Sequence, residues 1–315
     1  MSKLIQITDR ADAAKPVGPR LSVEKRTRKR EPGPRPDWLK VRYRRNDTFS
    51  AVKNLKSELN LVTVCEEARC PNIDECWSAG TATFMLMGDI CTRHCGFCAV
   101  SKGKPRALDP DEPLNTARAI KMLGVKHAVI TSVNRDELPD GGADHFAKTV
   151  TAIKSESPET RVELLVPDFL GDRHAMDVVL QSEPDIVAHN IETVPRLYRR
   201  VRPDATYQRS LDVLQHISES ASISKTGLMM GLGETDEEVE SVMCDLRDVG
   251  CQILSLGQYL SPTTRHLAVD RWVEPDTFDR LASVGMAMGF MHVESGPMVR
   301  SSYMAHRAFD SKSGG

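Results

Sequence analysis

The chain has 315 residues, of which 40% are hydrophobic and 27% are charged, and its net charge is −2. This composition excludes a fibrous or wholly disordered protein, and the length suits one large α/β domain or two ordinary ones. The sequence contains no apolar run of membrane-spanning length and no N-terminal secretion signal or transit peptide, so we expect a cytoplasmic location and no membrane partner.

The N-terminal region is basic. Residues 1–45 hold 14 Lys or Arg against 5 Asp or Glu, which leaves a charge of −11 on the rest of the chain. Residues 1–36 are rich in proline and charge, which predicts a basic, largely disordered arm. The run Lys25–Arg30 could indicate nucleic-acid binding, but aromatic residues for base stacking are missing around it. We therefore predict a solvated arm and no nucleic-acid partner.

A cysteine-rich extension is predicted over residues 37–80. It begins with a segment, Phe49–Leu59, whose apolar residues have helical spacing. The array Cys65-x4-Cys70-x5-Cys76 follows. Its spacing matches no zinc knuckle, and a proline after the second cysteine forces a turn that can bring its neighbours together. An iron–sulfur cluster is the favoured interpretation, and a zinc site completed by another residue is the alternative.

The second array, Cys91-x3-Cys95-x2-Cys98, comes directly after an apolar run that is typical of a buried strand. Eight cysteines in a chain without a signal peptide indicate metal or redox chemistry rather than disulfides. Thiolates select zinc, copper(I) or iron–sulfur clusters. Four ligands would close a zinc site or saturate a cubane cluster, so three leave one iron open. A zinc loop completed by His94 is the alternative.

From residue 81 onward, short apolar runs alternate with amphipathic segments. Strands that alternate with helices imply right-handed βαβ units and a parallel sheet. Six units predict an α/β fold with a partial (β/α)6 barrel over residues 81–297, and a doubly wound open sheet is the alternative. The predicted strands are 81–88, 127–133, 161–167, 186–191, 224–231, 252–259 and a final 291–294; the predicted helices are 113–124, 143–156, 173–181, 207–219, 235–249 and 275–289.

Several polar residues fall within the predicted strands or at their carboxyl ends, where the loops of a parallel sheet gather. Ser132 ends the second strand, and Asn190 and Glu192 follow the fourth. Glu163 is a carboxylate within an apolar run, which is costly to bury without a partner. Each residue alone could equally be a turn residue or a satisfied core group. Their convergence on one rim favours a functional site.

Two further segments carry charge or hydroxyl groups. Arg199-Arg200-Val-Arg202 is a cationic cluster that could hold an acidic partner or a cofactor carboxylate, and could equally be solvated surface. Arg300-Ser301-Ser302-Tyr303 follows the last predicted strand and by itself would be a turn or a cap. Residues 298–315 are predicted to form a C-terminal tail that caps the barrel mouth.

Six segments together resemble the lipoyl synthases, a family of radical S-adenosylmethionine (SAM) enzymes. The resemblance covers Trp38 to Tyr303 and leaves the basic arm unexplained. The segments are Cys65-x4-Cys70-x5-Cys76, Cys91-x3-Cys95-x2-Cys98, Thr131-Ser-Val-Asn-Arg-Asp136, Val166-Pro-Asp-Phe169, Gly231-Leu-Gly-Glu-Thr235 and Arg300-Ser-Ser-Tyr303.

The resemblance implies two [4Fe-4S] clusters and SAM as cofactors. Cys91, Cys95 and Cys98 would hold the cluster whose open iron binds SAM, and SAM cleavage would yield a 5′-deoxyadenosyl radical that removes hydrogen from unactivated carbon. Further cofactor contacts are expected from residues along the strand ends and the cysteine loop: Phe97, Ser132, Glu163, Asn190 and Arg202.

The second cluster would be auxiliary and would supply sulfur. By the same resemblance, Cys65, Cys70 and Cys76 hold it, together with a serine oxygen, and the family pattern favours Ser302 over Ser301. A hard oxygen is a weaker ligand than a thiolate, which suits a cluster that releases sulfur. The implied activity is a sulfurtransferase reaction that inserts two sulfur atoms, at C6 and C8, into an octanoyl chain on a lysine.

The resemblance also implies protein partners. The octanoylated lysine would belong to lipoyl carrier domains of 2-oxoacid dehydrogenase E2 subunits and the glycine cleavage H protein, with Arg199 and Arg200 as docking residues. A ferredoxin- or flavodoxin-type reductant and an iron–sulfur carrier for cluster repair are expected. The alternatives are another radical SAM enzyme with an auxiliary cluster, and a zinc-stabilised nucleic-acid-binding protein. Colour separates the zinc protein, because iron–sulfur proteins are brown.

Overall fold

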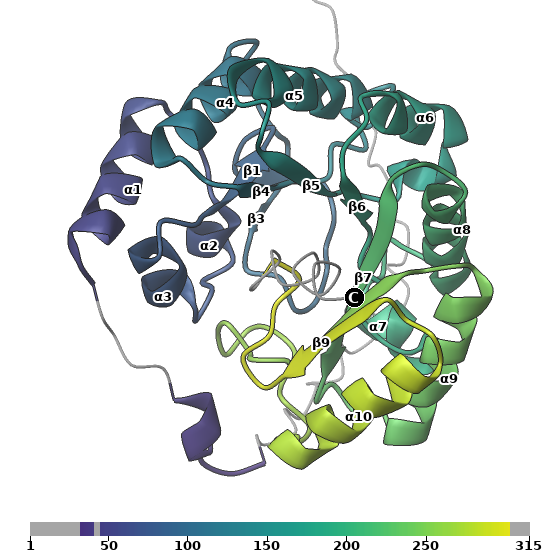
Figure 1. Cartoon of the computed structure of the whole chain (residues 1–315). Helices are drawn as coiled ribbons and strands as arrows, with labels where there is room; N and C mark the ends of the chain where they lie inside the picture. Colours follow the sequence, from purple (N-terminus) through teal and green to yellow (C-terminus); the bar gives the residue numbers. More distant parts are fainter. Residues whose placement is uncertain (1–31, 41–44, 303–315) are drawn as a thin grey trace, which may run out of the picture.

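The structure of the protein is a computed structural model that describes residues 32–40 and 45–302. Figure 1 shows strands arranged around a common centre, with helices outside them. The run Lys25–Arg30, most of the predicted arm and Tyr303 of the C-terminal motif lie outside the described residues.

The central sheet has seven parallel strands in the order β1-β4-β5-β6-β7-β8-β9. Because the order is linear, β1 and β9 are its two edges, as expected for a partial barrel. The predicted α/β fold with a parallel sheet is confirmed. The strands are β1 (Thr83–Leu86), β4 (His127–Ser132), β5 (Arg161–Leu165), β6 (Ile186–Ala188), β7 (Ile223–Met230), β8 (Ile253–Gln258) and β9 (His292–Gly296).

One long helix connects each strand of this sheet to the next, and these helices form the outer layer (Figure 1). Each lies where the apolar periodicity predicted it. Thr235 and Glu238 form the capping box at the start of α9, with reciprocal hydrogen bonds of 3.2 and 2.9 Å. The helices are α4 (Glu112–Leu123), α5 (Ala143–Glu156), α6 (Arg173–Gln181), α8 (Tyr207–Ser218), α9 (Asp236–Asp248) and α10 (Pro275–Ala287).

The two faces of the sheet differ in chemistry. On β5, Val162 and Leu164 are buried in the apolar cluster that joins the sheet to its helices. Side chains alternate along a strand, so Glu163 between them points to the opposite face, the barrel interior. Apolar burial against the helices holds the sheet in place, and on β5 it leaves the inner face to Glu163.

The cysteine-rich extension covers the free edge of β1. The backbone N–H of Met85 donates to Val62 O at 2.9 Å, and Thr63 forms an antiparallel bridge with Phe84. This pairing satisfies an edge that would otherwise be exposed. Three helices make up the extension and lie beside β1 in Figure 1: α1 (Asp47–Glu58), which confirms the helix predicted there, α2 (Val64–Glu67) and α3 (Ile73–Ser78).

Some short elements were not predicted. A two-stranded parallel ribbon flanks the second cysteine array, and its strands are too short to show a periodicity. None of the helices in the described part of the chain is both long and apolar enough to cross a membrane. The short elements are β2 (Ile90–Cys91), β3 (Ser101–Lys102), α7 (Tyr198–Val201) and the 3-10 turns η1 (Asp37–Leu39), η2 (Phe169–Gly171) and η3 (Pro195–Leu197).

Candidate functional site

The loop that carries Cys91, Cys95 and Cys98 begins at the end of β2, beyond the carboxyl end of β1. All three are free thiols and are partly buried. Burial raises the pKa of Cys95 to about 12, against a smaller opposing effect of Arg202, and burial also raises the pKa of Cys98. Binding to a cationic metal centre stabilises such thiols as thiolates.

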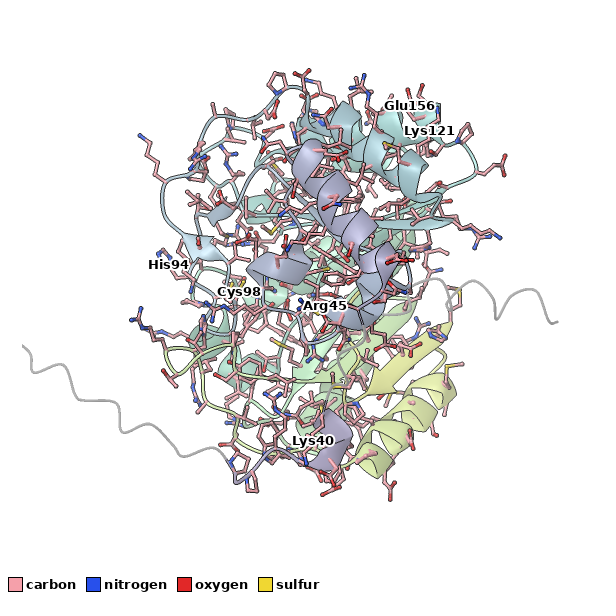
Figure 2. All side chains as sticks on the ribbon, turned by 90° about the vertical axis from the view of Figure 1, so that its left-hand side faces the viewer. Lys40, Arg45, His94, Cys98, Lys121 and Glu156 are labelled. Atoms are coloured by element: carbon pink, nitrogen blue, oxygen red, sulfur yellow. The ribbon has the colours of Figure 1, made fainter. Side chains whose placement is uncertain are left out.

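His94 does not join the cysteines. Its side chain is 67% exposed, and its Nδ1 lies 3.3 Å from Asp204 Oδ2. Figure 2 shows His94 nearer the edge of the molecule than Cys98. No group of three Cys, His, Asp or Glu side chains among residues 32–40 and 45–302 is arranged to hold a single metal ion. The zinc loop completed by His94 therefore lacks support, whereas in a cubane cluster each thiolate binds a different iron.

Arg93 anchors the cysteine loop to the neighbouring strands. Its guanidinium forms a two-point contact with Asp136 at 2.7 Å and lies 2.6 Å from Asp168. Burial opposes ionisation of Asp168, but the hydrogen bond and charge of Arg93 outweigh it and lower the pKa of Asp168 to about 2. Arg209 also contacts Asp168, at 3.2 Å. The ion pairs of Arg93 with Asp136 and Asp168 thus hold the loop in place.

Cys91 is oriented by the end of β4. The backbone N–H of Asn134 lies 3.3 Å from Cys91 Sγ, and the backbone N–H of Arg93 lies 3.5 Å from it. Such N–H donors can hydrogen-bond to the sulfur of a metal-bound cysteine and fix its orientation.

Three buried oxygens at the carboxyl ends of β4 and β6 have no hydrogen-bond partner within residues 32–40 and 45–302: Ser132 Oγ, Asn134 Oδ1 and Asn190 Oδ1. Buried polar atoms are normally satisfied, so each requires an explanation. On β7, a Cβ at Gly227 would come within 2.9 Å of Asn190 Oδ1, so only glycine leaves that oxygen its space. Unsatisfied acceptors and a hydroxyl beside a cysteine triplet fit a polar cofactor such as SAM. Two of them, Ser132 and Asn190, were predicted from the sequence.

Arg202 lies beside this group. Its Nη1 donates to Asn190 O at 2.7 Å, to Tyr198 OH at 2.8 Å and to Ser210 Oγ at 3.2 Å. These acceptors are all neutral, and within the described residues no carboxylate is hydrogen-bonded to Arg202. Its charge does act on Glu192, whose pKa it lowers against the larger effect of burial. An anionic group of a cofactor would complete its environment.

Glu163 is held inside the barrel by two partners from other strands. Lys225 Nζ lies 2.7 Å from its carboxylate, and His127 Nε2 donates to it at 3.0 Å. Burial opposes ionisation, but Lys225 and His127 prevail and lower the pKa of Glu163. A buried carboxylate in an apolar strand was expected to need a partner, and for Glu163 this partner is Lys225. A cofactor contact by Glu163 stays a prediction.

Glu192 is a further residue of the rim. The sequence predicted its place after the fourth strand, but it was not among the expected cofactor contacts. It has a left-handed backbone conformation, φ 67°, and accepts a hydrogen bond from Asn190 Nδ2 at 3.1 Å. Burial raises its pKa, and its charge in turn raises the pKa values of Cys95 and Cys98. The strained backbone is the signal that marks it, and the sequence does not show it.

The first cysteine triplet is gathered by the extension. Cys65 lies in α2, Cys76 in α3 and Cys70 between them, around a small core that contains Trp77. Burial raises the pKa of Cys65 to about 11 and that of Cys76 to about 12, and Cys65 and Cys70 raise the latter further. The three thiols are therefore close enough to influence one another's ionisation.

Trp77 adds a donor to this triplet. Its buried indole N–H has no hydrogen-bond partner within normal geometry, yet it lies near enough to Cys65 to favour the thiolate. A donor aimed at sulfur suits thiolate or sulfide acceptors.

The C-terminal motif connects the barrel to the extension. Asn72 Nδ2 donates to Met298 O at 2.8 Å. Arg300 is partly buried. Desolvation lowers its pKa, and Cys70 has a smaller opposing effect. Ser301 lies against β7, because its Cβ is 3.6 Å from the place that a Cβ at Gly227 would take. The motif thus lies near Cys70 of the extension and near Gly227 of β7, and Ser302, which is partly buried, is the last described residue.

Sequence models of two protein families match the chain. The radical SAM superfamily matches residues 85–246. The N-terminal domain of lipoyl synthase of the radical SAM family matches residues 8–70. The second match corrects the expectation that the basic arm lies outside the resemblance, because it begins at residue 8.

Curated relatives are similar over most of the chain. A lipoyl synthase from Rubrobacter xylanophilus is 55% identical over 274 residues, 86% of this chain and 85% of the relative. One from Caldanaerobacter subterraneus is 52% identical over 273 residues, 86% of this chain and 95% of the relative. Among solved structures, methylornithine synthase has a TM-score of 0.54 at 13% identity and covers 81% of this chain and 84% of its own; this likeness concerns the fold alone.

Proposed function

The chain belongs to the lipoyl synthase family of radical SAM enzymes, and from this premise we propose that it is a sulfurtransferase that inserts sulfur at C6 and C8 of an octanoyl chain. The chain would be carried on a lysine of a lipoyl carrier domain, from a 2-oxoacid dehydrogenase E2 subunit or a glycine cleavage H protein. The supporting observation is that the chain carries two separate cysteine triplets, one in the extension and one in the loop that begins at β2.

SAM and iron–sulfur chemistry follow from the family, and the assignment of residues is our proposal. Cys91, Cys95 and Cys98 would hold a [4Fe-4S] cluster with one open iron. When bound, this cluster would supply the electron that cleaves SAM into methionine and a 5′-deoxyadenosyl radical. Arg93 keeps the three ligands in place through Asp136 and Asp168.

The rim of the barrel would orient SAM. Ser132 Oγ and Asn190 Oδ1 lack partners in the described part of the chain and would bind polar groups of SAM. Arg202 would face its carboxylate, since it has only neutral hydrogen-bond acceptors. Phe97, next to Cys98, and Glu163, inside the barrel, complete the proposed set.

The extension would hold the auxiliary cluster. Cys65, Cys70 and Cys76 supply three thiolates, and Ser302 is the proposed fourth ligand. The packing of Ser301 against β7 supports this choice over Ser301. When bound, this second [4Fe-4S] cluster would supply the sulfur atoms, and an iron–sulfur carrier would be needed to rebuild it.

Iron and sulfide analysis of anaerobically purified protein tests the proposal. About eight irons per chain are expected if each triplet holds one four-iron cluster, and about four after Cys65, Cys70 and Cys76 are all replaced by Ala. Cys244→Ala is the matched control, because Cys244 is exposed and lies outside both triplets.

The product provides the second readout. The wild type should add two sulfur atoms to an octanoylated carrier, as measured by mass, and the triple variant should cleave SAM without adding sulfur. Equal iron contents in the wild type and the triple variant would contradict the proposed pair of clusters.

A further inference from the structure

The outer side of the cysteine loop is contacted by three separate segments. From β3, Lys102 Nζ donates to Cys95 O at 3.0 Å. From α7, Val201 O accepts from the N–H of Gly96 at 2.9 Å. From the segment 261–267, His266 Nε2 donates to Cys98 O at 3.0 Å. These contacts place all three segments directly against the metal-binding loop.

Gly96 shows how closely they pack. A Cβ at this position would lie 3.0 Å from the side chain of Leu267 and 3.3 Å from Arg200 O. The loop is therefore pressed between α7 and the segment 261–267. Little protein separates the thiolates from the surface on this side, because Lys102 reaches Cys95 O and is itself exposed.

Each of the three segments exposes positive charge. The five exposed side chains are named here the basic rim: Lys102, Lys104, Arg199, Arg200 and Arg265. In the part of the chain that the structure describes, none of the five forms an ion pair, whereas Arg196, one turn before Arg200, is paired with Glu238. The acidic Asp204 lies next to the loop but is hydrogen-bonded to His94.

Unpaired cations in one place create a field that attracts an anionic partner. The rim surrounds the outside of the loop, which is where an electron has to enter to reach the proposed SAM-binding centre. An octanoyl chain, in contrast, has to reach the barrel interior, where Ser132 and Asn190 lie. The position of the rim thus suits an electron donor better than a carrier domain.

We propose that the basic rim is the docking surface for an acidic one-electron donor protein that carries a flavin or an iron–sulfur centre. This inference rests on the proposed function. One electron passes from the reduced donor to the centre held by Cys91, Cys95 and Cys98, so that the donor is oxidised by one electron for each SAM cleaved. The proposal reassigns Arg199 and Arg200, which the resemblance had suggested for carrier docking.

A charge-reversal variant tests the surface. Lys104→Glu, Arg199→Glu and Arg265→Glu are combined, since in the described part of the chain none of these three side chains forms a hydrogen bond or ion pair with the cysteine loop. The control combines Lys53→Glu, Arg118→Glu and Lys126→Glu, which changes the net charge equally on exposed positions of α1, α4 and the start of β4. Binding of a purified acidic flavodoxin is measured by calorimetry at low salt.

The rim variant should bind flavodoxin at least about tenfold more weakly than the wild type, and the control should bind it nearly as the wild type does. Adding about 0.3 M salt should weaken binding by the wild type and change that of the rim variant less. Equal affinities of the rim variant and the control would overturn the proposal, whatever the activity of the enzyme.

SAM cleavage separates the donor from the carrier. With dithionite as the reductant, the rim variant should cleave SAM and modify the octanoylated carrier at the wild-type rate. With reduced flavodoxin at limiting concentration, its rate should fall by about tenfold. A raised KM for the carrier under dithionite would instead assign the rim to the carrier and overturn the proposal. If the proposed function itself were wrong, the wild-type protein would not cleave SAM even with dithionite.

Discussion

Asn72 donates a hydrogen bond of 2.8 Å to Met298 O, across 226 residues of sequence. It links the cysteine extension to the C-terminal motif, so that both triplets and the proposed serine ligand belong to one structure. The link joins residues that are far apart in sequence. It depends on one side chain, so a single substitution of Asn72 tests it.

Asn72→Ala should weaken this link. Loss of one buried hydrogen bond is expected to cost about 1 kcal/mol of unfolding free energy, and the auxiliary triplet should lose iron to a chelator faster than the wild type. Asn54→Ala, at an exposed position of α1, is the matched control. Iron loss at the same rate in both variants would show that the contact with Met298 does not support the auxiliary site.

Ser132 and Thr131 are adjacent hydroxyl residues with opposite expected roles. Thr131 Oγ1 donates to Leu165 O at 3.0 Å, whereas Ser132 Oγ has no partner among the residues that the structure describes. Thr131→Val should therefore cost about 1 kcal/mol of stability and leave SAM affinity unchanged. Ser132→Ala should leave stability unchanged and weaken SAM binding by about fivefold. Urea unfolding and equilibrium dialysis measure the two effects, and unchanged SAM affinity in Ser132→Ala would remove Ser132 from the cofactor site.

Lys225 and Glu163 form a pair that should be strongly coupled. Lys225→Met leaves the Glu163 carboxylate buried with its main partner gone, at a cost of about 3–5 kcal/mol of unfolding free energy. Adding Glu163→Gln should recover much of this loss. Denaturant unfolding of the two single variants and the double variant gives the coupling energy. Additive losses would show that the pair is not coupled, and normal SAM binding by Glu163→Gln would exclude a cofactor contact by Glu163.

His189 should make stability depend on pH. Burial, and to a smaller extent the charge of Arg202, lower the pKa of His189 to about 4. The folded chain then binds this proton only near pH 4, whereas an unfolded histidine binds it near pH 6.5. Stability from this group is therefore complete above pH 6.5 and decreases as the pH falls towards 4, by about 1.3 kcal/mol between pH 7.5 and 5.5.

Unfolding curves at the two pH values check this expectation. His189→Gln should reduce the pH dependence by that amount, and His174→Gln, at an exposed position, should not. The neutral ring is the form that fits, because Nδ1 donates to Val166 O and Nε2 faces the Ser210 hydroxyl, each at 3.0 Å. Equal pH dependence in the wild type and His189→Gln would contradict the expectation.

The sequence alone determined the elements and the positions of the two cysteine arrays. Cysteine spacings within a dozen residues and apolar periodicities within single helices or strands are local properties, so Cys91–Cys98, Cys65–Cys76 and the βα alternation could be identified directly. Ser132 and Asn190 were also accessible, since the carboxyl ends of parallel strands converge whatever the details of packing.

Only the tertiary structure decided which distant groups meet. Lys225 as the partner of Glu163, Arg93 as the link to Asp168 and the contact of α7 with Gly96 all join separate loops or strands. Their pairing depends on strand order and register, which the periodicity of one segment does not contain. The strained backbone of Glu192 likewise exists only because its neighbours on β7 hold it, so it became visible only in the folded chain.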